Sequence, residues 1–476
     1  MKKLLSLIPF LALIALIFVC VSVFGTDALD GATQVSLLVA SAVCVLVGYL
    51  KGGLDWMELE REMTDKIATC TPSIIILLLI GAIGGTWMIS GIVPTMVYYG
   101  VQVLRPEWFL VSSSLFCALV SLMVGSSWTT VATIGVALMG IGRALGFDEG
   151  WVAGSIITGA YFGDKLSPLS DTTVLASSVS GTPLFTHIRY MMQTTIPAFC
   201  LSLFIFAVAG LLMDVADGSA VGFLDELTDT FYISPWLLLI PVLTGVMIAR
   251  RWPAMVVLFL AALMAAVAAG VFQQELIAQI VGSSERGLRT SYEGVMKIIY
   301  ASTQLQTGTP LLDELVHTGG MAGMMPTVWL IICAQVFAGV VTATGVLRDM
   351  MNLLLHFVRG TASLVASTVF TGIFCNVALA DQFLSIILTS SVFQSAYRER
   401  GYEARLLSRT CEDGATVTSV LVPWNTCGLV QSTVLGVATL TYLPYCFFNL
   451  LSPVASVVVA ATGRGIVREH REQPTA

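Results

Sequence analysis

The sequence has little charge for its length. Of its 476 residues, 11% are Asp, Glu, Lys or Arg, against about 25% in an ordinary soluble protein. Hydrophobic residues make up 56% of the chain, and the tract from Leu4 to Val23 is close to the length that crosses roughly 30 Å of hydrocarbon. Such tracts recur along the whole chain, which a soluble core does not require. The composition predicts an all-α polytopic membrane protein with about 12–14 transmembrane helices.

The sequence also lacks the patterns of several catalytic and binding classes. Its ten cysteines form no C-x-x-C pair and no zinc spacing, and we interpret them as small hydrophobic residues. Its four histidines form no H-E-x-x-H motif, and there is no phosphate-binding P-loop. The net charge of −7 lies largely in loops and identifies no partner; we expect none among nucleic acids. We therefore expect no cofactor and no ATP-driven step.

The positions of Lys and Arg predict the orientation of the chain in the membrane, because bases favour the cytoplasmic side. Bases cluster at both ends of the chain, from Lys51 to Lys66, and at Arg250 and Arg251, whereas residues 214–230 hold five acids and no base. Both termini are therefore expected in the cytoplasm, which requires an even number of crossings. We interpret the N-terminal tract as a first span and not a cleaved signal peptide, because no clear cleavage site precedes Gly25.

Two parts of the chain resemble each other. Residues 124–173 align without gaps on residues 379–428, and the alignment pairs Pro168 with Pro423. The identity is low, so the alternative is a chance similarity of apolar helices. If the repeat is real, each copy carries a proline-interrupted segment at the same place.

The charges of one turn predict that this repeat is inverted. The turn from Arg143 to Gly150 holds one base and two acids, whereas its counterpart from Arg398 to Arg409 holds four bases. The Lys/Arg bias then places the first turn outside and the second in the cytoplasm. Inverted repeats with paired interrupted segments are typical of secondary transporters, whose binding sites lie near the bilayer midplane where the interruptions meet.

The tracts from Leu110 to Ile141 and from Thr361 to Ala396 exceed one straight span, so we expect broken or re-entrant helices there. The repeat also predicts a division of the chain. The expected segments are N-terminal accessory spans (1–66), a first repeat with half of the transport site (67–213), linking spans with an external loop (214–321), a second repeat with the other half (322–461) and a cytoplasmic tail (462–476).

The run from Gly163 to Thr173 places two carboxylates, a lysine and four hydroxyl groups around Pro168. Charges at bilayer depth are costly unless paired or solvated, so this cluster predicts a functional site. The proline disfavours helix at Ser167 and frees backbone carbonyl groups. Carbonyl, hydroxyl and carboxylate oxygens are ligands that a small hard cation such as Na⁺ prefers.

The two carboxylates of this run, Asp164 and Asp171, would lie about 10 Å apart along the axis of a straight helix. The interruption must therefore bring them together, or they serve separate roles. Lys165 is expected to neutralise one carboxylate when no ion is bound. The alternative is that Asp164 and Lys165 only extend toward the interface from a helix end.

The second half carries polar residues around Pro423. Glu412 and Asp413 precede this proline by ten or eleven residues, whereas Asp164 precedes its own proline by four. A separate polar island surrounds Asp381, for which we expect a functional role facing the lumen, with a hydrogen-bonded packing role as the alternative. The island also contains Asn376 and Gln382, and its residues Asp381 and Gln382 align with Ser126 and Ser127. The second cluster offers neutral oxygen ligands from Thr416, Thr418, Ser419, Asn425 and Thr426.

The run from Gly159 to Thr173, together with that from Val422 to Gly428, closely resembles the signature of the NhaC-type sodium/proton antiporter family. The resemblance covers most of the chain. It implies a prokaryotic inner-membrane exchanger of Na⁺ and H⁺, built from two inverted repeats with interrupted helices. One position differs, because Val174 stands where many members have Asn, which removes one oxygen ligand. By the same resemblance, Asp164, Ser167, Asp171 and Thr172 hold Na⁺ along the ion path, with Asn425 and Thr426 opposite.

The leading hypothesis is a secondary antiporter that exchanges Na⁺, or Li⁺, for H⁺. A carboxylate that releases H⁺ can bind Na⁺, so one site serving both ions in turn gives exchange without ATP. The alternative is a Na⁺- or H⁺-coupled carrier of a small organic acid or amino acid, whose carboxylate a half-helix N-terminus would hold. The expected partners are the lipid bilayer and the transported solutes. The sequence does not decide whether the protein forms a homodimer.

Two other classes fit the sequence less well. An intramembrane aspartyl protease also needs two carboxylates within the membrane. Its G-x-G-D pattern is broken here by Tyr161, and an inverted repeat has no role in such an enzyme. The remaining class is a membrane sensor that transports nothing. A measurement of cation flux in sealed vesicles would distinguish it from a transporter.

Overall fold

The computed structural model describes residues 5–24, 31–52, 54–213, 219–250, 252–283, 287–303, 318–355, 360–463, 465–466 and 468. Within these ranges the protein is built of helices, and the only β-type pairings are two isolated bridges. Several charged residues used above to predict orientation lie outside the described residues: Lys2, Lys3, Asp214, Asp217, Arg251, Arg464 and Arg471.

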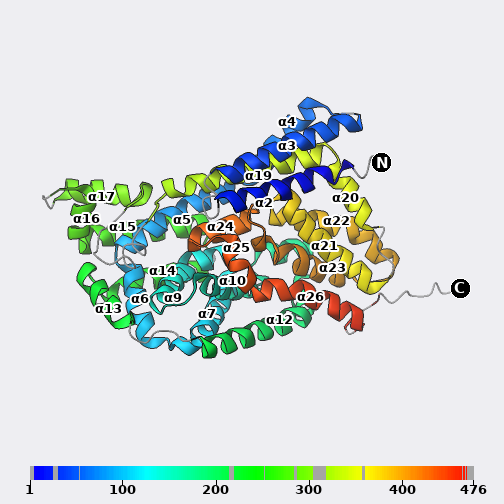
Figure 1. Ribbon diagram of the computed structural model, residues 1–476. Coiled ribbons are helices and arrows are strands. Elements are labelled where there is room, and N and C mark those ends of the chain that lie inside the picture. The colour runs from blue at the N-terminus through cyan, green and yellow to red at the C-terminus, as the bar shows by residue number, and fades with distance from the viewer. Residues whose placement is uncertain are drawn as a thin grey trace.

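The N-terminal and linking helices flank the rest of the chain. In Figure 1 the helices α2, α3 and α19 run side by side along one edge, α12 follows the opposite edge, and α10 and α24 lie between them. The N-terminal helices are α2 (Ile8–Phe24), α3 (Ala32–Lys51) and α4 (Trp56–Thr69). The linking helices are α13 (Ser219–Thr230), η4 (Pro235–Leu238), α14 (Leu239–Ala249), α15 (Ala254–Phe272), α16 (Gln274–Val281) and α17 (Leu288–Tyr300).

The two remaining segments carry the interrupted helices. The first contains α5 (Thr71–Ile89), α6 (Ile92–Val103), η2 (Pro106–Trp108), α7 (Phe109–Val124), α8 (Ser127–Thr130), the π-helix η3 (Val131–Gly135), α9 (Val136–Ala144), α10 (Glu149–Leu166), α11 (Asp171–Ser180) and α12 (Leu184–Leu212). The second contains η5 (Ala322–Met324), α19 (Met325–Ala343), α20 (Val346–Leu355), α21 (Thr361–Leu379), α22 (Gln382–Glu399), α23 (Ala404–Cys411), the π-helix η6 (Glu412–Thr416), η7 (Ser419–Leu421), α24 (Thr426–Leu435), α25 (Thr439–Tyr442), η8 (Leu443–Tyr445) and α26 (Phe447–Thr462).

The protein is an all-α polytopic membrane protein, as the composition predicts. Among the described residues, seven helices are long and apolar enough to cross a membrane, or up to nine if each of two bent helix pairs is one span. Three shorter apolar helices, α2, α6 and α26, accompany them. The total of 12–14 spans and the division into accessory, repeat and linking segments stay predictions.

The sequence repeat is confirmed by the bounds of the helices. Three consecutive elements of the second segment begin and end 255 residues after their counterparts in the first, so the ungapped alignment holds through the turns as well as the helices. The matched pairs are α8 to α9 with α22, α10 with α23 to η7, and α11 with α24.

Each copy contains an interruption that has no proline. The chain turns at Gly125, between α7 and α8, with φ of 72°, and at the matching Ala380, between α21 and α22, with φ of 53°. Ala380 is the one non-glycine residue with positive φ among those described. Such backbone strain is characteristic of functional sites. These turns confirm that the two overlong tracts are broken helices.

The inverted orientation is testable by labelling single cysteines. Asp148→Cys, in the turn predicted to be external, should react with a membrane-impermeant maleimide on intact cells. Glu399→Cys, in the matching turn, should react only after permeabilisation, because its neighbouring bases favour the cytoplasm. The background is Cys200→Ser, since the other nine native cysteines are buried. Labelling of both positions from one side would contradict the inverted repeat.

Candidate functional site

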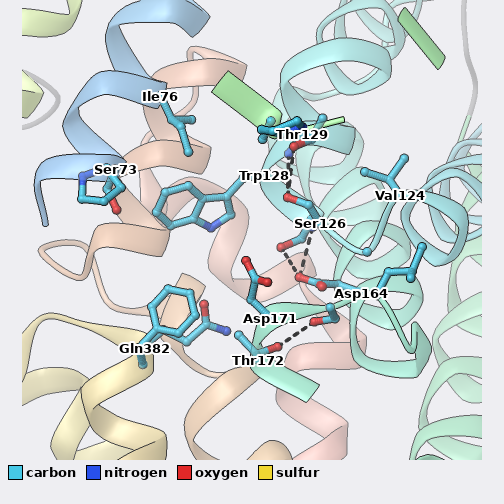
Figure 2. A pocket seen from close by; sticks show the side chains of 18 of the residues that line it. Ser73, Ile76, Val124, Ser126, Trp128, Thr129, Asp164, Asp171, Thr172 and Gln382 are labelled. Atoms are coloured by element: carbon cyan, nitrogen blue, oxygen red, sulfur yellow. Dashed lines mark hydrogen bonds between the residues drawn. The ribbon is translucent and has the colours of Figure 1, made fainter. Parts of the chain in front are cut away.

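A cavity of about 480 Å³ lies against the first proline interruption. It is bounded by the ends of α7 and α10, the starts of α5, α8, α11 and α15, and α22 of the second repeat. Two carboxylates, hydroxyl groups and an amide face it (Figure 2). Its principal polar lining residues are Ser126, Ser127, Asp164, Asp171, Thr172 and Gln382.

Asp164 forms one wall of this cavity, in the last turn of α10. Its side chain is 7% exposed. Its Oδ2 accepts hydrogen bonds from the backbone N–H of Ser127 at 3.1 Å and from the Ser127 hydroxyl at 2.7 Å. Ser127 is the first residue of α8, which continues through η3 into α9. The carboxylate therefore lies at a helix N-terminus, where the helix dipole stabilises negative charge.

Asp171 approaches the same cavity from the other side of the interruption. It is the first residue of α11, and its side chain is exposed. Figure 2 shows the carboxylates of Asp164 and Asp171 pointing into one space. Beside them, the Thr172 hydroxyl lies 3.0 Å from that of Ser170. The interruption thus brings together two carboxylates that a straight helix would separate.

Side-chain hydroxyl groups form hydrogen bonds with the backbone at the interruption. The Ser167 hydroxyl donates to the Leu122 carbonyl at 2.8 Å and accepts from the backbone of Leu169. The carbonyl of Lys165, which lacks a helical partner, accepts a hydrogen bond from the Thr173 hydroxyl at 3.0 Å. Ser167 does not line the cavity. Of the four expected Na⁺ ligands, the structure brings together Asp164, Asp171 and Thr172.

Lys165 points to a different partner. Its ammonium forms an ion pair with Asp413 of η6, and both side chains are fully buried. Ser452 of α26 and Thr194 of α12 also donate to Asp413, at 2.8 Å and at 3.0 to 3.2 Å. Lys165 therefore neutralises a carboxylate, but one of the second repeat. Its burial, and that of Asp164, exclude the interpretation that these residues only extend toward the interface.

Glu412, next to this ion pair, is buried without a partner. Its side chain is 0% exposed, and neither carboxylate oxygen has a hydrogen bond among the described residues. The hydroxyl of Thr416, at the other end of the same π-helix, is also buried without a partner there. Burying an unpaired charge is costly, so such a carboxyl group is favoured when it carries a proton.

The residues around the second interruption mainly cap helices. Asp381 accepts a hydrogen bond from the backbone of Leu384 at 2.8 Å, as the N-cap of α22, and does not line the cavity. Asn425 caps α24 and also donates to the Asn376 carbonyl at 3.2 Å. The backbone N–H of Thr426 donates to the Ala380 carbonyl at 2.9 Å. Asp381 therefore forms a helix cap in this structure, and its expected functional role stays a prediction.

Two polar residues of the cavity, Ser127 and Gln382, were absent from the expected ligands. They are equivalent in the two repeats, since each is the first residue of the helix that follows a left-handed turn. Gln382 donates to the Thr416 carbonyl at 3.2 Å and accepts from the Cys427 thiol at 2.9 Å. The repeat alignment was the signal for both, because it paired two polar islands within apolar tracts.

Comparison with known proteins identifies the family. The model of the Na⁺/H⁺ antiporter family matches residues 159–464, which include the interruptions at Pro168 and Pro423. The chain belongs to this family. It is a secondary antiporter, and the NhaC-type resemblance of its sequence motifs is confirmed.

Three relatives cover nearly the whole chain. The chain is 36% identical to the Na⁺/H⁺ antiporter NhaC of Alkalihalophilus pseudofirmus, over 90% of each protein. It is 33% identical to the malate-2H⁺/Na⁺-lactate antiporter of Bacillus subtilis, over 94% of this chain and 93% of the relative. It is 31% identical to the arginine/ornithine antiporter ArcD of Halobacterium salinarum, over 98% of this chain and 94% of the relative. Proteins similar to this one therefore bear the names of different substrates.

Proposed function

We propose that this protein exchanges Na⁺, or Li⁺, for H⁺ at the cavity beside Asp164 and Asp171. The observation that carries the proposal is the convergence of two carboxylates on one cavity, from both sides of an interrupted helix. Hydroxyl and carboxylate oxygens suit a small hard cation. A proton and Na⁺ can occupy such carboxylates only in turn, which is the basis of exchange.

The charge of the cavity favours a cation over an organic anion. Among the described residues, its lining contains Asp164 and Asp171 and no Lys, Arg or His. Lys165, which follows Asp164 in the sequence, forms an ion pair with Asp413 instead. A dicarboxylate or lactate would meet the like charge of these two carboxylates. A cationic amino acid is the alternative substrate that fits the same charge, and the cavity volume of about 480 Å³ would admit one.

The lining of the cavity includes segments that lie near predicted cytoplasmic bases. Pro72 and Ser73 follow the Lys66 end of α4, and residues 252–254 follow Arg250. We infer from these neighbours that the cavity exchanges ions with the cytoplasm in this conformation. We place the protein in the inner membrane of a prokaryote with both termini in the cytoplasm. A homodimer stays a prediction and is not required.

The substrate is tested with purified protein in sealed proteoliposomes that carry an imposed pH gradient. Fluorescence dequenching should follow addition of Na⁺ or Li⁺ at low millimolar or lower concentration. K⁺, lactate, malate, arginine and ornithine are added in separate arms. Dissipation by arginine or ornithine without Na⁺ would establish the cationic amino acid alternative, and a response only to lactate or malate would overturn the proposal.

Competition between the two ions gives a pH dependence. Acidification should raise the apparent KM for Na⁺ and leave the maximal rate much less affected, because protons occupy the carboxylates that bind Na⁺. The limit for one competing proton is roughly tenfold per pH unit. The measurement is the initial rate of ²²Na⁺ uptake at several pH values. A KM that does not change with pH would argue against a shared site.

A further inference from the structure

A second polar cavity, of about 380 Å³, is lined by residues of α12 and α23 and shares no lining residue with the ion site. We call it the α12–α23 pocket. Its lining residues in the described part of the chain are Phe185, Thr186, Arg189, Tyr190, Gln193 and Arg405, which include two arginines and no acid. The bases of the turn before α23 predict that this end of both helices is cytoplasmic.

The arginines of the pocket are only partly neutralised. Arg405 pairs with Glu403, outside the lining, at 2.6 Å, and its guanidinium lies 5.2 Å from the ring centre of Tyr190. Arg189 is exposed and forms no ion pair with the described residues. At least one full positive charge therefore faces this pocket without a counter-ion among the described residues.

A third arginine, Arg409, lies behind the pocket wall. Its side chain is fully buried, its guanidinium lies 4.7 Å from the Tyr190 ring centre, and its Nη1 donates to Gln193 at 3.4 Å. Its Nε and Nη2 have no hydrogen bond among the described residues. The Nε is 3.9 Å from Asp413, but that carboxylate already pairs with Lys165.

Two buried cations thus share the Asp413 carboxylate, because the neighbouring buried acid, Glu412, is favoured when it carries a proton. The surplus positive charge lies against the pocket. Burying incompletely paired charge is costly. An anion in the pocket would offset this cost, since Arg409 contacts two of the lining residues.

We propose that the α12–α23 pocket binds the phosphate of an anionic lipid headgroup from the cytoplasmic leaflet. Guanidinium groups recognise phosphate through paired, charge-assisted hydrogen bonds. Basic pockets between transmembrane helices on the cytoplasmic side suit such headgroups. Phe185, which is 73% exposed at the pocket, provides apolar surface for the adjoining acyl chains. A soluble phosphate ester shares the headgroup chemistry but gains nothing from Phe185.

The position of the pocket gives the bound lipid an effect on transport. Arg409 links the pocket to Asp413, Asp413 pairs with Lys165, and Lys165 is adjacent in sequence to Asp164 of the ion site. A headgroup that attracts Arg409 weakens the interaction of Arg409 with Asp413, so the Asp413 carboxylate interacts more strongly with Lys165. Anionic lipid therefore stabilises the contact between the two repeats, whichever ions are exchanged.

Binding is tested on the purified protein with dioctanoyl phosphatidylglycerol, with affinity measured by native mass spectrometry and thermal shift. Arg189→Gln should weaken the apparent Kd about fivefold, the effect of removing one base near an anionic headgroup. The matched control is Arg400→Gln. It removes an exposed arginine from the predicted cytoplasmic turn before α23, outside the pocket. Equal weakening by both variants, or no weakening by Arg189→Gln, would overturn the site.

The source of the phosphate is separated by two further probes. Glycerol phosphate should bind much more weakly than the lipid, and Phe185→Ala should weaken lipid binding without changing glycerol phosphate binding. Equal affinity for both probes would overturn the lipid assignment. Dioctanoyl phosphatidylcholine, a phosphodiester with no net charge, should bind the wild type no better than it binds Arg189→Gln. Because no transported ion takes part, failure of these measurements is distinct from failure of the proposed exchange.

Discussion

Asp164→Asn is expected to abolish exchange while the protein still folds. The substitution keeps the side-chain volume but removes the negative charge that receives two hydrogen bonds at the start of α8. Losing one member of a buried charge interaction costs about 2–5 kcal/mol, which corresponds to a loss of about 30-fold or more. The measurement is Na⁺-driven dissipation of a pH gradient in proteoliposomes, at matched protein density.

Two variants serve as references for this experiment. Asp65→Asn removes an exposed carboxylate of α4 and should leave exchange unchanged. Ser127→Ala removes one hydroxyl donor to Asp164 but keeps the backbone donor. It should raise the KM for Na⁺ or shift its pH dependence, because hydrogen bonds to charged groups contribute about 1.5–3 kcal/mol. Near-normal exchange by Asp164→Asn would leave that carboxylate a structural role and overturn the proposed site.

The part of the site that is local in sequence could be predicted. Pro168 and Pro423 cannot continue a helix, and α10 and η7 end two residues before these prolines. The ungapped alignment carried this information from one repeat to the other. Asp164, Asp171 and Thr172 lie within eight residues of one another around such an interruption, so their convergence follows from the local chain path.

The contacts between repeats could not be predicted in this way. Lys165 and Asp413 are separated by 248 positions, and no sequence pattern specifies which buried carboxylate a lysine will meet. The turn at Ala380 has no proline or glycine to indicate it, because the left-handed conformation there is imposed by the surrounding packing. The helix cap that Asp381 forms directly after this turn was likewise not indicated by its isolation in an apolar tract.

The buried ion pair between the repeats leads to the second large prediction. Asp413→Asn should destabilise the protein strongly, because Lys165 and Arg409 both lose their carboxylate. Breaking a buried pair by removing one member costs about 3–5 kcal/mol. Lys165→Met should cost less, because Asp413 keeps Arg409, Thr194 and Ser452 as partners. Asp413→Asn is therefore expected to lower the free energy of unfolding more than Lys165→Met does.

Thermal unfolding of the purified variants measures this difference, and the double variant Lys165→Met/Asp413→Asn supplies the decisive comparison. Once Asp413 is neutral, removing Lys165 also removes an uncompensated buried charge, so the double variant should be more stable than Asp413→Asn alone. Asp65→Asn, which breaks the exposed pair with Arg61, should change stability by less than about 1 kcal/mol. Strictly additive effects of Lys165→Met and Asp413→Asn would show that the two side chains are not coupled. The ion pair would then add nothing to the contact between the repeats, which hydrogen bonds such as that between His187 and Ser408 and apolar packing would maintain.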